Sequence, residues 1–190
     1  TERVGALIQI LSQHPNHTYS LSYFCQLFKA AKSTVSEDVS VAKQLLSTME
    51  LGKIETMAGA KGGIRFLPMV SIEKRKILLD NLSERLSDGS RILGGGFLYT
   101  SDLMFDADIA GGVAELFAQK FANTGADYVV TIETKGIPVA FMTAYMLNLP
   151  LVVVRRESKI SEGSTVSINY FSGSSDRIQK MSLAKRAVEP

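Results

Sequence analysis

One short polar segment carries the residue types best suited to binding an anion. The apolar run Tyr128–Ile132 is followed by Glu133–Gly136, and Pro138 then suits the first turn of a helix. A strand, a polar loop and a helix N-terminus in this order offer backbone N–H groups and a positive dipole end. Lys135 adds a full charge, and Gly136 lets the backbone approach a ligand closely. The pattern predicts a phosphate or pyrophosphate site, and the alternative is an ordinary turn with a solvent-facing lysine. The predicted anion contacts are Thr134, Lys135, Gly136 and Ile137.

More positive charge is expected at the same place. A second apolar run, Leu151–Val154, is followed by Arg155 and Arg156, and Lys159 comes three residues later. Strand, helix and strand of these lengths predict one right-handed βαβ unit with parallel strands, each buried on both faces. The three basic residues would then lie at the sheet edge that carries the polar loop and would attract an anionic ligand. Surface ion pairs between the arginines and nearby glutamates are the alternative.

Three aromatic residues complete the predicted ligand site. Phe97 and Tyr99 follow the glycines of 94–96, and either ring could stack on a base, although core packing is the commoner role. Tyr170 lies in an alternating apolar and polar run that is followed by a Ser/Gly turn and a second such run, 177–187. These two runs predict an antiparallel hairpin that could cover the site.

The first seventy residues predict three short helices and a β-hairpin. Apolar residues recur at helical spacing in 4–11, 21–28 and 35–46. Ser20 and Ser33 are the predicted caps of the second and third helices, and Gly52 suits the position after the third. Two short strands around a Gly-rich turn follow. This order predicts a winged helix-turn-helix, whose third helix enters the major groove of DNA and whose hairpin is the wing.

The residues predicted to face DNA carry groups that bond phosphates and base edges. They are Arg3, Lys32, Ser33, Thr34, Ser36, Lys43, Lys61 and Arg65. Glu37 and Asp38 would repel phosphate, and their alternative role is to stabilise a helix N-terminus. Winged helices that bind protein instead of DNA remain an open alternative.

Composition limits the class of protein without defining it. A chain of 190 residues has room for one or two domains, and the net charge of +2 favours no particular partner. The predicted division is a winged-helix domain (1–70), a connecting helix capped by Ser71 that could also form a dimer surface (71–90), and an effector domain (91–190). The single cysteine, Cys25, argues against a disulfide framework and for a reducing cytoplasm. No metal site, signal peptide or membrane-spanning run is expected.

The motifs together resemble known families. The loop at 133–137, the segment Val-Arg-Arg-Glu-Ser-Lys and the Ser-Ile-Asn-Tyr hairpin resemble a type I phosphoribosyltransferase domain. With the winged helix, the chain resembles bacterial purine operon repressors over essentially its whole length. Further matching segments are 36–38, 59–63, 134–138, 162–170 and 181–186. The resemblance implies an α/β fold with an N-terminal winged helix-turn-helix and a type I phosphoribosyltransferase-like parallel sheet, incomplete in this chain. The family's paired acids and Gly-rich threonine loop are not found, so we expect a chain clipped at both ends.

The same resemblance implies a function. It implies a homodimer that binds palindromic operator DNA and represses purine biosynthesis and salvage genes in the cytoplasm. The implied effector is phosphoribosyl pyrophosphate (PRPP), with guanosine tetraphosphate as a competitor, no tightly bound cofactor and no catalysis. The alternative is a catalytically active purine phosphoribosyltransferase with an appended interaction domain.

Overall fold

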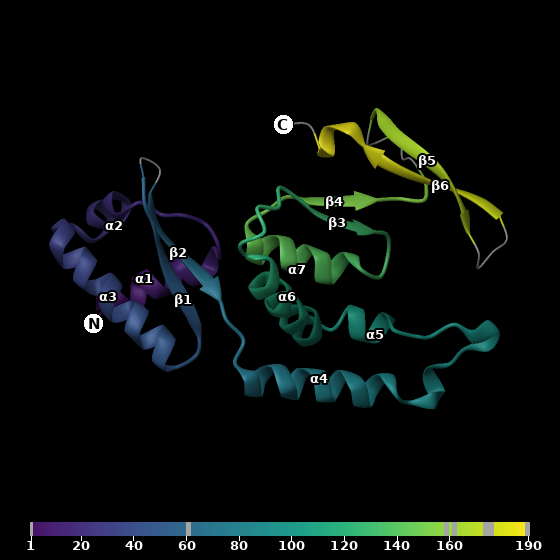
Figure 1. The fold of residues 1–190 in the computed structure, drawn as a ribbon, viewed down its shortest axis with the longest axis horizontal. Helices are drawn as coiled ribbons and strands as arrows, with labels where there is room; N and C mark the ends of the chain where they lie inside the picture. The colour runs from purple at the N-terminus through teal and green to yellow at the C-terminus, as the bar shows by residue number, and fades with distance from the viewer. Residues whose placement is uncertain (1, 60–61, 158–159, 161–162, 173–176, 189–190) are drawn as a thin grey trace.

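The computed structural model describes residues 2–59, 62–157, 160, 163–172 and 177–188. Figure 1 shows two lobes, an N-terminal lobe drawn in purple and blue and a C-terminal lobe drawn in teal to yellow. A long helix, α4, lies along the second lobe and is joined to the first by a short connection. The mixed α/β class expected from the sequence is confirmed.

The N-terminal lobe has the predicted order of a winged helix. Its elements are α1 (Glu2–Gln13), α2 (Leu21–Phe28), α3 (Lys32–Thr48), β1 (Gly52–Met57) and β2 (Gly63–Pro68). The two strands pair antiparallel, and Tyr19 forms a bridge to Ile64 on the other side of β2. A Cβ atom on Gly63 would overlap the Tyr19 carbonyl group, so only glycine permits this close approach.

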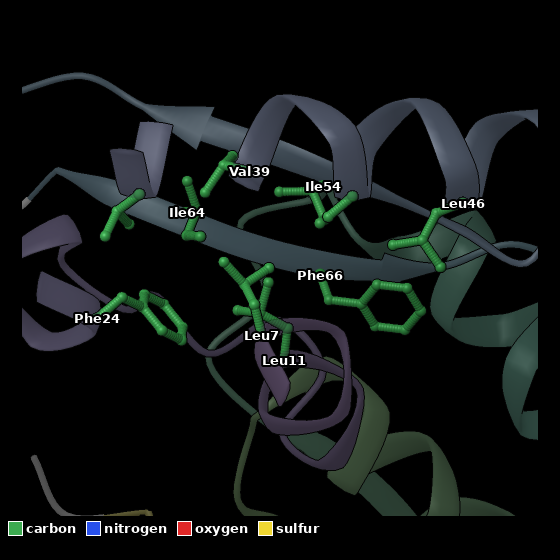
Figure 2. Packing of buried hydrophobic residues seen from close by; sticks show 10 residues of the cluster. Leu7, Leu11, Phe24, Val39, Leu46, Ile54, Ile64 and Phe66 are labelled. Carbon is green, nitrogen blue, oxygen red and sulfur yellow. The ribbon is translucent and has the colours of Figure 1, made fainter. Parts of the chain in front are cut away.

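One apolar core unites these elements. Side chains from α1, α2, α3 and both strands meet between the helices and the hairpin, as Figure 2 shows. Leu7, Leu11 and Phe24 expose no surface at all. The buried members of the cluster are Leu7, Leu11, Phe24, Val35, Val39, Ala42, Leu46, Ile54, Ile64 and Phe66. Burial of this set explains why three short helices, each marginal alone, are stable together.

Two of the three predicted helix boundaries in this lobe are wrong. Ser20 caps α2 as predicted, accepting a hydrogen bond from the Tyr23 N–H. Helix α3, however, begins at Lys32 after Ala31, so Ser33 lies inside its first turn. Its C-cap is Met49, and Gly52 instead begins β1. A Cβ atom at position 52 would overlap the Phe66 ring, so packing rather than helix termination requires this glycine.

Helix α4 (Ile72–Leu86) connects the lobes and buries none of its residues. Ser71 caps it as predicted, accepting from the Lys74 N–H. Two ion pairs hold it against α6 and the residue that caps α6: Lys74 Nζ to Glu115 Oε2 at 2.6 Å and Arg85 Nη1 to Asp106 Oδ2 at 3.3 Å. Two short 3-10 helices follow, η1 (Gly89–Arg91) and η2 (Gly94–Gly96).

The C-terminal lobe contains the predicted βαβ unit. Its elements are α5 (Ser101–Met104), α6 (Ala107–Phe121), β3 (Val129–Ile132), α7 (Ile137–Leu147), β4 (Leu151–Val154), β5 (Thr165–Ser172), β6 (Arg177–Ala184) and the 3-10 helix η4 (Lys185–Ala187). Strands β3 and β4 pair parallel, and β5 and β6 form the predicted antiparallel hairpin. A bridge between Arg155 and Ser182 joins that hairpin to the end of β4. Figure 1 shows α7 and then α6 stacked on one side of the β3–β4 pair.

The prediction that β3 is buried on both faces is wrong. Its residues alternate between half-buried and exposed, and Val130 and Ile132 expose 60% and 49% of their surface. Helix α7 packs against the pair, and a strand covered on one face shows this period of two. On β4, Val152 is buried while its neighbours are half-buried.

Candidate functional site

The predicted anion loop lies between β3 and α7, at the carboxyl end of the parallel pair. The Glu133 N–H donates to the Val154 carbonyl at 2.9 Å, so the loop starts beside the end of β4. The peptide bond between Glu133 and Thr134 is cis. Helix α7 then begins at Ile137 with Gly136 as its cap and no side-chain capping bond. This is the strand, loop and helix N-terminus that the sequence predicts.

The loop leaves backbone donors available. Within the described part of the chain, no acceptor bonds to the N–H of Lys135 or of Gly136. The side chains of Thr134 and Lys135 are exposed. A Cβ atom on Gly136 would stand 2.9 Å from Thr131 Oγ1, so a larger residue would displace its neighbours. Free N–H groups at the positive end of a helix can bind a phosphate or another anion.

Glu133 organises the basic residues at this edge. Its carboxylate lies 3.2 Å from Arg155 Nη1 and accepts a hydrogen bond of 2.7 Å from the Arg156 N–H. Arg155 is therefore held against the loop, whereas the Arg156 side chain is exposed. Sequence reasoning missed this role of Glu133, although its position directly after a parallel strand was an available signal. Lys159 lies outside the described residues.

The three predicted aromatic residues have contacts elsewhere or exposed side chains. Phe97 and Tyr99 expose 69% and 45% of their surface, and the Tyr99 backbone is held by Arg91. Tyr170 on β5 donates from its hydroxyl to Gln179 at 2.6 Å. Among the described residues, no hydrogen bond or ring contact links these side chains to Thr134–Ile137. Their part in ligand binding stays a prediction.

The largest described cavity adjoins the loop but suits a different chemistry. It has a volume of about 630 Å³ and lies among β3, α5, α6 and α7, with Thr131 and Gly136 in its wall. Its lining is almost wholly apolar, with residues such as Val113 and Leu147. Such a surface offers little to a phosphate, so the polar loop at its edge remains the candidate anion site.

The exposed side of α3 carries most of the predicted DNA contacts. Lys32, Ser33 and Ser36 are exposed and Thr34 is half-buried, all within the first two turns. Lys43 donates from Nζ to Thr56 Oγ1 at 2.7 Å, which ties the helix to β1. Lys61 lies outside the described residues. The N-terminal half of α3 thus presents hydroxyls and one free ammonium group on one surface.

Two arginines predicted to face DNA form ion pairs with carboxylates of the protein. Arg3 donates two hydrogen bonds to the buried Asp38, from Nε to Oδ2 at 2.7 Å and from Nη2 to Oδ1 at 3.3 Å. The hydrogen bond that Arg3 donates to Asp38, and then the negative charge of Asp38, raise the pKa of Arg3. Asp38 therefore neither caps α3 nor faces phosphate; it joins α3 to α1.

Arg65 is likewise engaged rather than free. Its Nη2 lies 2.9 Å from Glu55 Oε2 and 3.1 Å from Asn123 Oδ1, and its side chain is 17% exposed. Hydrogen bonds from Lys53 and then Arg65 lower the pKa of Glu55. Both guanidinium groups are paired with carboxylates, and the DNA contacts of Arg3 and Arg65 stay predictions.

Neither a metal centre nor a membrane segment is found in the part of the chain that the structure describes. There, no group of three or more His, Cys, Asp and Glu residues could hold a metal ion. No described helix is both long enough and apolar enough to cross a bilayer.

A winged helix joined to a βαβ unit with a polar loop at its parallel-sheet edge defines a class of regulator with a phosphoribosyltransferase-like domain. Residues 1–68 match the profile of the bacterial purine repressor N-terminal domain, and residues 104–188 match that of the phosphoribosyl transferase domain. The chain is 40% identical to the purine biosynthesis transcriptional repressor PurR of Bacillus subtilis, over 98% of this chain and 67% of that protein. The chain belongs to the bacterial purine repressor family.

Two further relatives differ in their named roles. The purine biosynthesis transcriptional activator PurR of Lactococcus lactis is 36% identical over 98% of this chain and 69% of that protein. A xanthine phosphoribosyltransferase of Streptococcus pneumoniae is 29% identical over 57% of this chain and 58% of the enzyme. The adenine phosphoribosyltransferase structure from Rhodothermus marinus is also similar, with 19% identity, a TM-score of 0.48, and coverage of 60% of this chain and 65% of that one.

Proposed function

We propose that this protein is a transcriptional regulator of purine biosynthesis and salvage genes. The observation that carries the proposal is the union, in one chain, of a winged helix exposing Lys32, Ser33 and Ser36 with a loop whose Lys135 and Gly136 N–H groups are unbonded within the described residues. The first surface suits a duplex, and the second suits a small phosphorylated ligand. Such a regulator acts where the chromosome lies, in the bacterial cytoplasm.

The proposed DNA target is a palindromic operator bound by a homodimer. A two-fold symmetric protein places its two recognition helices in successive major grooves, and a palindrome matches that symmetry. The hydroxyls and ammonium group of the first turns of α3 are the proposed contacts to base edges and phosphates. Arg3 and Arg65 are proposed as secondary contacts, because their guanidinium groups are also paired with Asp38 and Glu55.

The proposed effector is PRPP, whose pyrophosphate group would sit against the N-terminus of α7. The N–H groups of Lys135 and Gly136, the Lys135 ammonium and the Arg156 guanidinium would supply the positive charge. Guanosine tetraphosphate carries pyrophosphate groups of the same kind and would compete for the same donors. The domain would act as a sensor without a tightly bound cofactor.

We propose that the sensor domain does not catalyse phosphoribosyl transfer. The support is that the relatives similar over nearly the whole chain are named as regulators, whereas the match to xanthine phosphoribosyltransferase covers 57% of it. That enzyme makes an active phosphoribosyltransferase the second candidate. Assay of the protein with PRPP and free purine bases distinguishes the two, because product formation would overturn the sensor proposal.

The direction of regulation is a separate question. Relatives named as a repressor and as an activator are similar to this chain at 40% and 36% identity. We propose repression, with DNA binding weakened by PRPP. Transcription of a purine operon in a strain lacking the protein should therefore rise, and a fall would show an activator.

Two lysines test whether the DNA and effector surfaces are separate. Lys135→Ala should weaken PRPP binding by about tenfold, the effect of one lost charge-assisted contact of about 1.4 kcal/mol, and leave operator affinity unchanged. Lys32→Ala should do the reverse, and should reduce the slope of operator affinity against salt by about one unit. Titrations of labelled operator and of PRPP measure both affinities for each variant.

Lys120→Ala is the matched control, since Lys120 is an exposed lysine on α6 that belongs to neither proposed surface. It should change neither affinity. Equal loss of both affinities in either test variant would show that the surfaces are not separable. A wild-type protein that binds operator no better than random duplex would overturn the proposed function itself.

A further inference from the structure

Helix α7 connects the two proposed sites physically. It begins directly after the anion loop, and residues 145 and 146 in its last turn bond to the winged-helix lobe. Its 11 residues correspond to a rigid span of about 16 Å at 1.5 Å per residue. In Figure 1, α7 runs from the loop beyond the tip of β3 back toward the N-terminal lobe. We propose that α7 couples effector binding to the position of the wing, an inference that rests on the proposed function.

The contact between α7 and the first lobe is a reciprocal capping of helix ends. The Tyr145 hydroxyl donates to the carbonyl of Gln13, the last residue of α1. In return, Asn16 Nδ2 donates to the carbonyl of Met146 at 2.7 Å. Carbonyls in the last turn of a helix have no hydrogen-bond donor within that helix. Each lobe therefore supplies a side-chain donor to a last-turn carbonyl of the other lobe's helix. This exchange fixes α7 along its axis, not merely against a face.

Asn16 also bonds to β2, the second strand of the wing. Its own N–H donates to the Phe66 carbonyl of β2 at 2.8 Å, while its side chain holds α7. Tyr19 and Ile64 then exchange two further backbone bonds, of 2.9 and 2.8 Å. Asn16 adopts a left-handed backbone conformation with φ of 60°, which asparagine tolerates better than most residues. One residue therefore connects the last turn of α7 to the strand that leads out of the wing.

A second contact holds the same strand against the effector lobe. Arg65 on β2 donates from Nη2 to Asn123 Oδ1 at 3.1 Å, just past the end of α6. Because α6 packs along α7, a movement of that pair would act on β2 through both Asn16 and Arg65. Hydrogen bonds weaken steeply as their length and angle depart from the ideal, so an axial shift of α7 would strain both caps.

The contacts of Asn16 and Tyr145 between α7 and the first lobe are called the bridge from here on. Coupling requires that the ligand favour one position of α7, and so one arrangement of the bridge, over another. An anion at the loop interacts with the N-terminal turn of α7, and the caps at its C-terminal turn hold the wing. If the ligand-bound loop suits a different axial position of α7, ligand binding and the DNA-binding arrangement of the wing oppose each other. By linkage, operator DNA must then weaken PRPP binding by the same factor.

The test removes the bridge and leaves both sites intact. The variant Asn16→Gly with Tyr145→Phe loses both interlobe donors, while glycine keeps the left-handed backbone and phenylalanine keeps the ring. Operator affinity is measured in the full protein with and without saturating PRPP, and PRPP affinity without DNA. Asn148→Gly is the matched control, because Asn148 is also left-handed, with φ of 54°, and caps α7 itself without a described bond to the first lobe.

In the wild type, the ratio of operator affinity without PRPP to operator affinity with saturating PRPP should lie in the range of about 5- to 150-fold that is typical of coupled sites. In the bridge variant this ratio should fall close to one, while each separate affinity stays near the wild-type value. Asn148→Gly should keep the full ratio. Hydrogen exchange at the β2 amides should respond to PRPP in the wild type and not in the bridge variant.

Each other outcome decides against the inference. An unchanged ratio in the bridge variant, with the wild type responding, would overturn the role of α7 and leave the proposed function standing. Loss of the ratio in Asn148→Gly would show that any change at this helix end suffices. Loss of operator binding by the bridge variant would show that the bridge maintains the DNA-binding form and carries no signal. A wild-type protein that ignores PRPP would overturn the proposed function together with this inference.

Discussion

The two lobes bury their apolar residues in different ways. In the winged-helix lobe, large side chains from five elements meet in one core, and Phe24, Leu7, Leu11, Ile64 and Val35 are among the largest fully buried side chains. Among the described residues of the effector lobe only Val152 belongs to that group, and the buried residues of α6 and α7 are largely alanines. Large apolar residues there, such as Phe141, remain exposed. Hydrophobic stabilisation scales with buried apolar area, so the described winged helix has more of it per residue. In this chain, which spans about two thirds of the length of its PurR relatives, the described effector lobe should therefore open at a lower free-energy cost than the winged helix.

The largest expected effect comes from two phenylalanines of opposite burial. Phe24 exposes 0% of its surface and Phe141 exposes 61%. Phe24→Ala should therefore lower the free energy of unfolding of the winged helix by about 3–5 kcal/mol. Phe141→Ala should cost within about 0.5 kcal/mol, as for other surface positions. Urea denaturation followed by far-UV circular dichroism measures both, and equal losses would contradict the contrast between the lobes.

Two glycines make the next test of the same contrast. Gly63→Ala forces a Cβ atom against the Tyr19 carbonyl, and overpacking of this kind costs about 1–3 kcal/mol. Gly94→Ala meets no atom within 4 Å, so it should be neutral or stabilising by up to about 1 kcal/mol. Melting temperatures of the two variants should move in different directions or differ clearly in size. A tolerated alanine at position 63 would show that the strand can move away from Tyr19.

The smallest expected effect is on the stability of the fold at low pH. Lys53 and Arg65 hold the pKa of Glu55 below its ordinary value of 4.5. A carboxyl whose pKa is lowered on folding stabilises the fold above its unfolded pKa, and this stabilisation is lost as pH falls through the folded value. The difference in stability between wild type and Glu55→Gln should thus be at most about 1 kcal/mol at neutral pH and should shrink as the pH falls below 4.5.

Asp102 in the effector lobe gives the comparison for that measurement. Its hydrogen bonds to Arg91 lower its pKa from 3.8 to about 2. The contribution of Asp102 should therefore persist to lower pH than that of Glu55. A pH series of unfolding measurements on Asp102→Asn beside Glu55→Gln would show the order, and loss of the Asp102 contribution first would contradict it.

Local patterns predicted the elements of the winged helix, the connecting helix, the βαβ unit and the C-terminal hairpin, because helical spacing and strand runs depend on neighbouring residues. Contacts between residues that are far apart in the chain were not predicted from the sequence. Arg3 and Asp38 are 35 positions apart, and nothing local indicates that they form an ion pair rather than a DNA contact and a helix-terminus acid. The start of α3 was also missed, because the chain enters it at Ala31 without a side-chain cap.

The candidate site also has a part that the sequence predicts and a part that it does not. The anion loop could be predicted because its strand, its polar residues and its helix are consecutive in the chain. The proposed part of Phe97, Tyr99 and Tyr170 depends on how separate segments come together, and the described contacts do not unite them with the loop. The caps supplied by Asn16 and Tyr145 were equally hidden, since each satisfies a carbonyl more than a hundred positions away.

The pairing of Tyr19 with Ile64 also limits how the wing can vary in length. With one edge of β2 bonded to β1 and the other to Tyr19, the strand's register is set from both sides. A single residue inserted between Gly63 and Pro68 would turn Ile64 and Phe66 to the opposite face, out of the core. Residues inserted between Met57 and Gly63 would lengthen the hairpin without moving its base. Length changes among wings of this kind should therefore concentrate at the tip, where a longer wing would reach further along the groove of its operator.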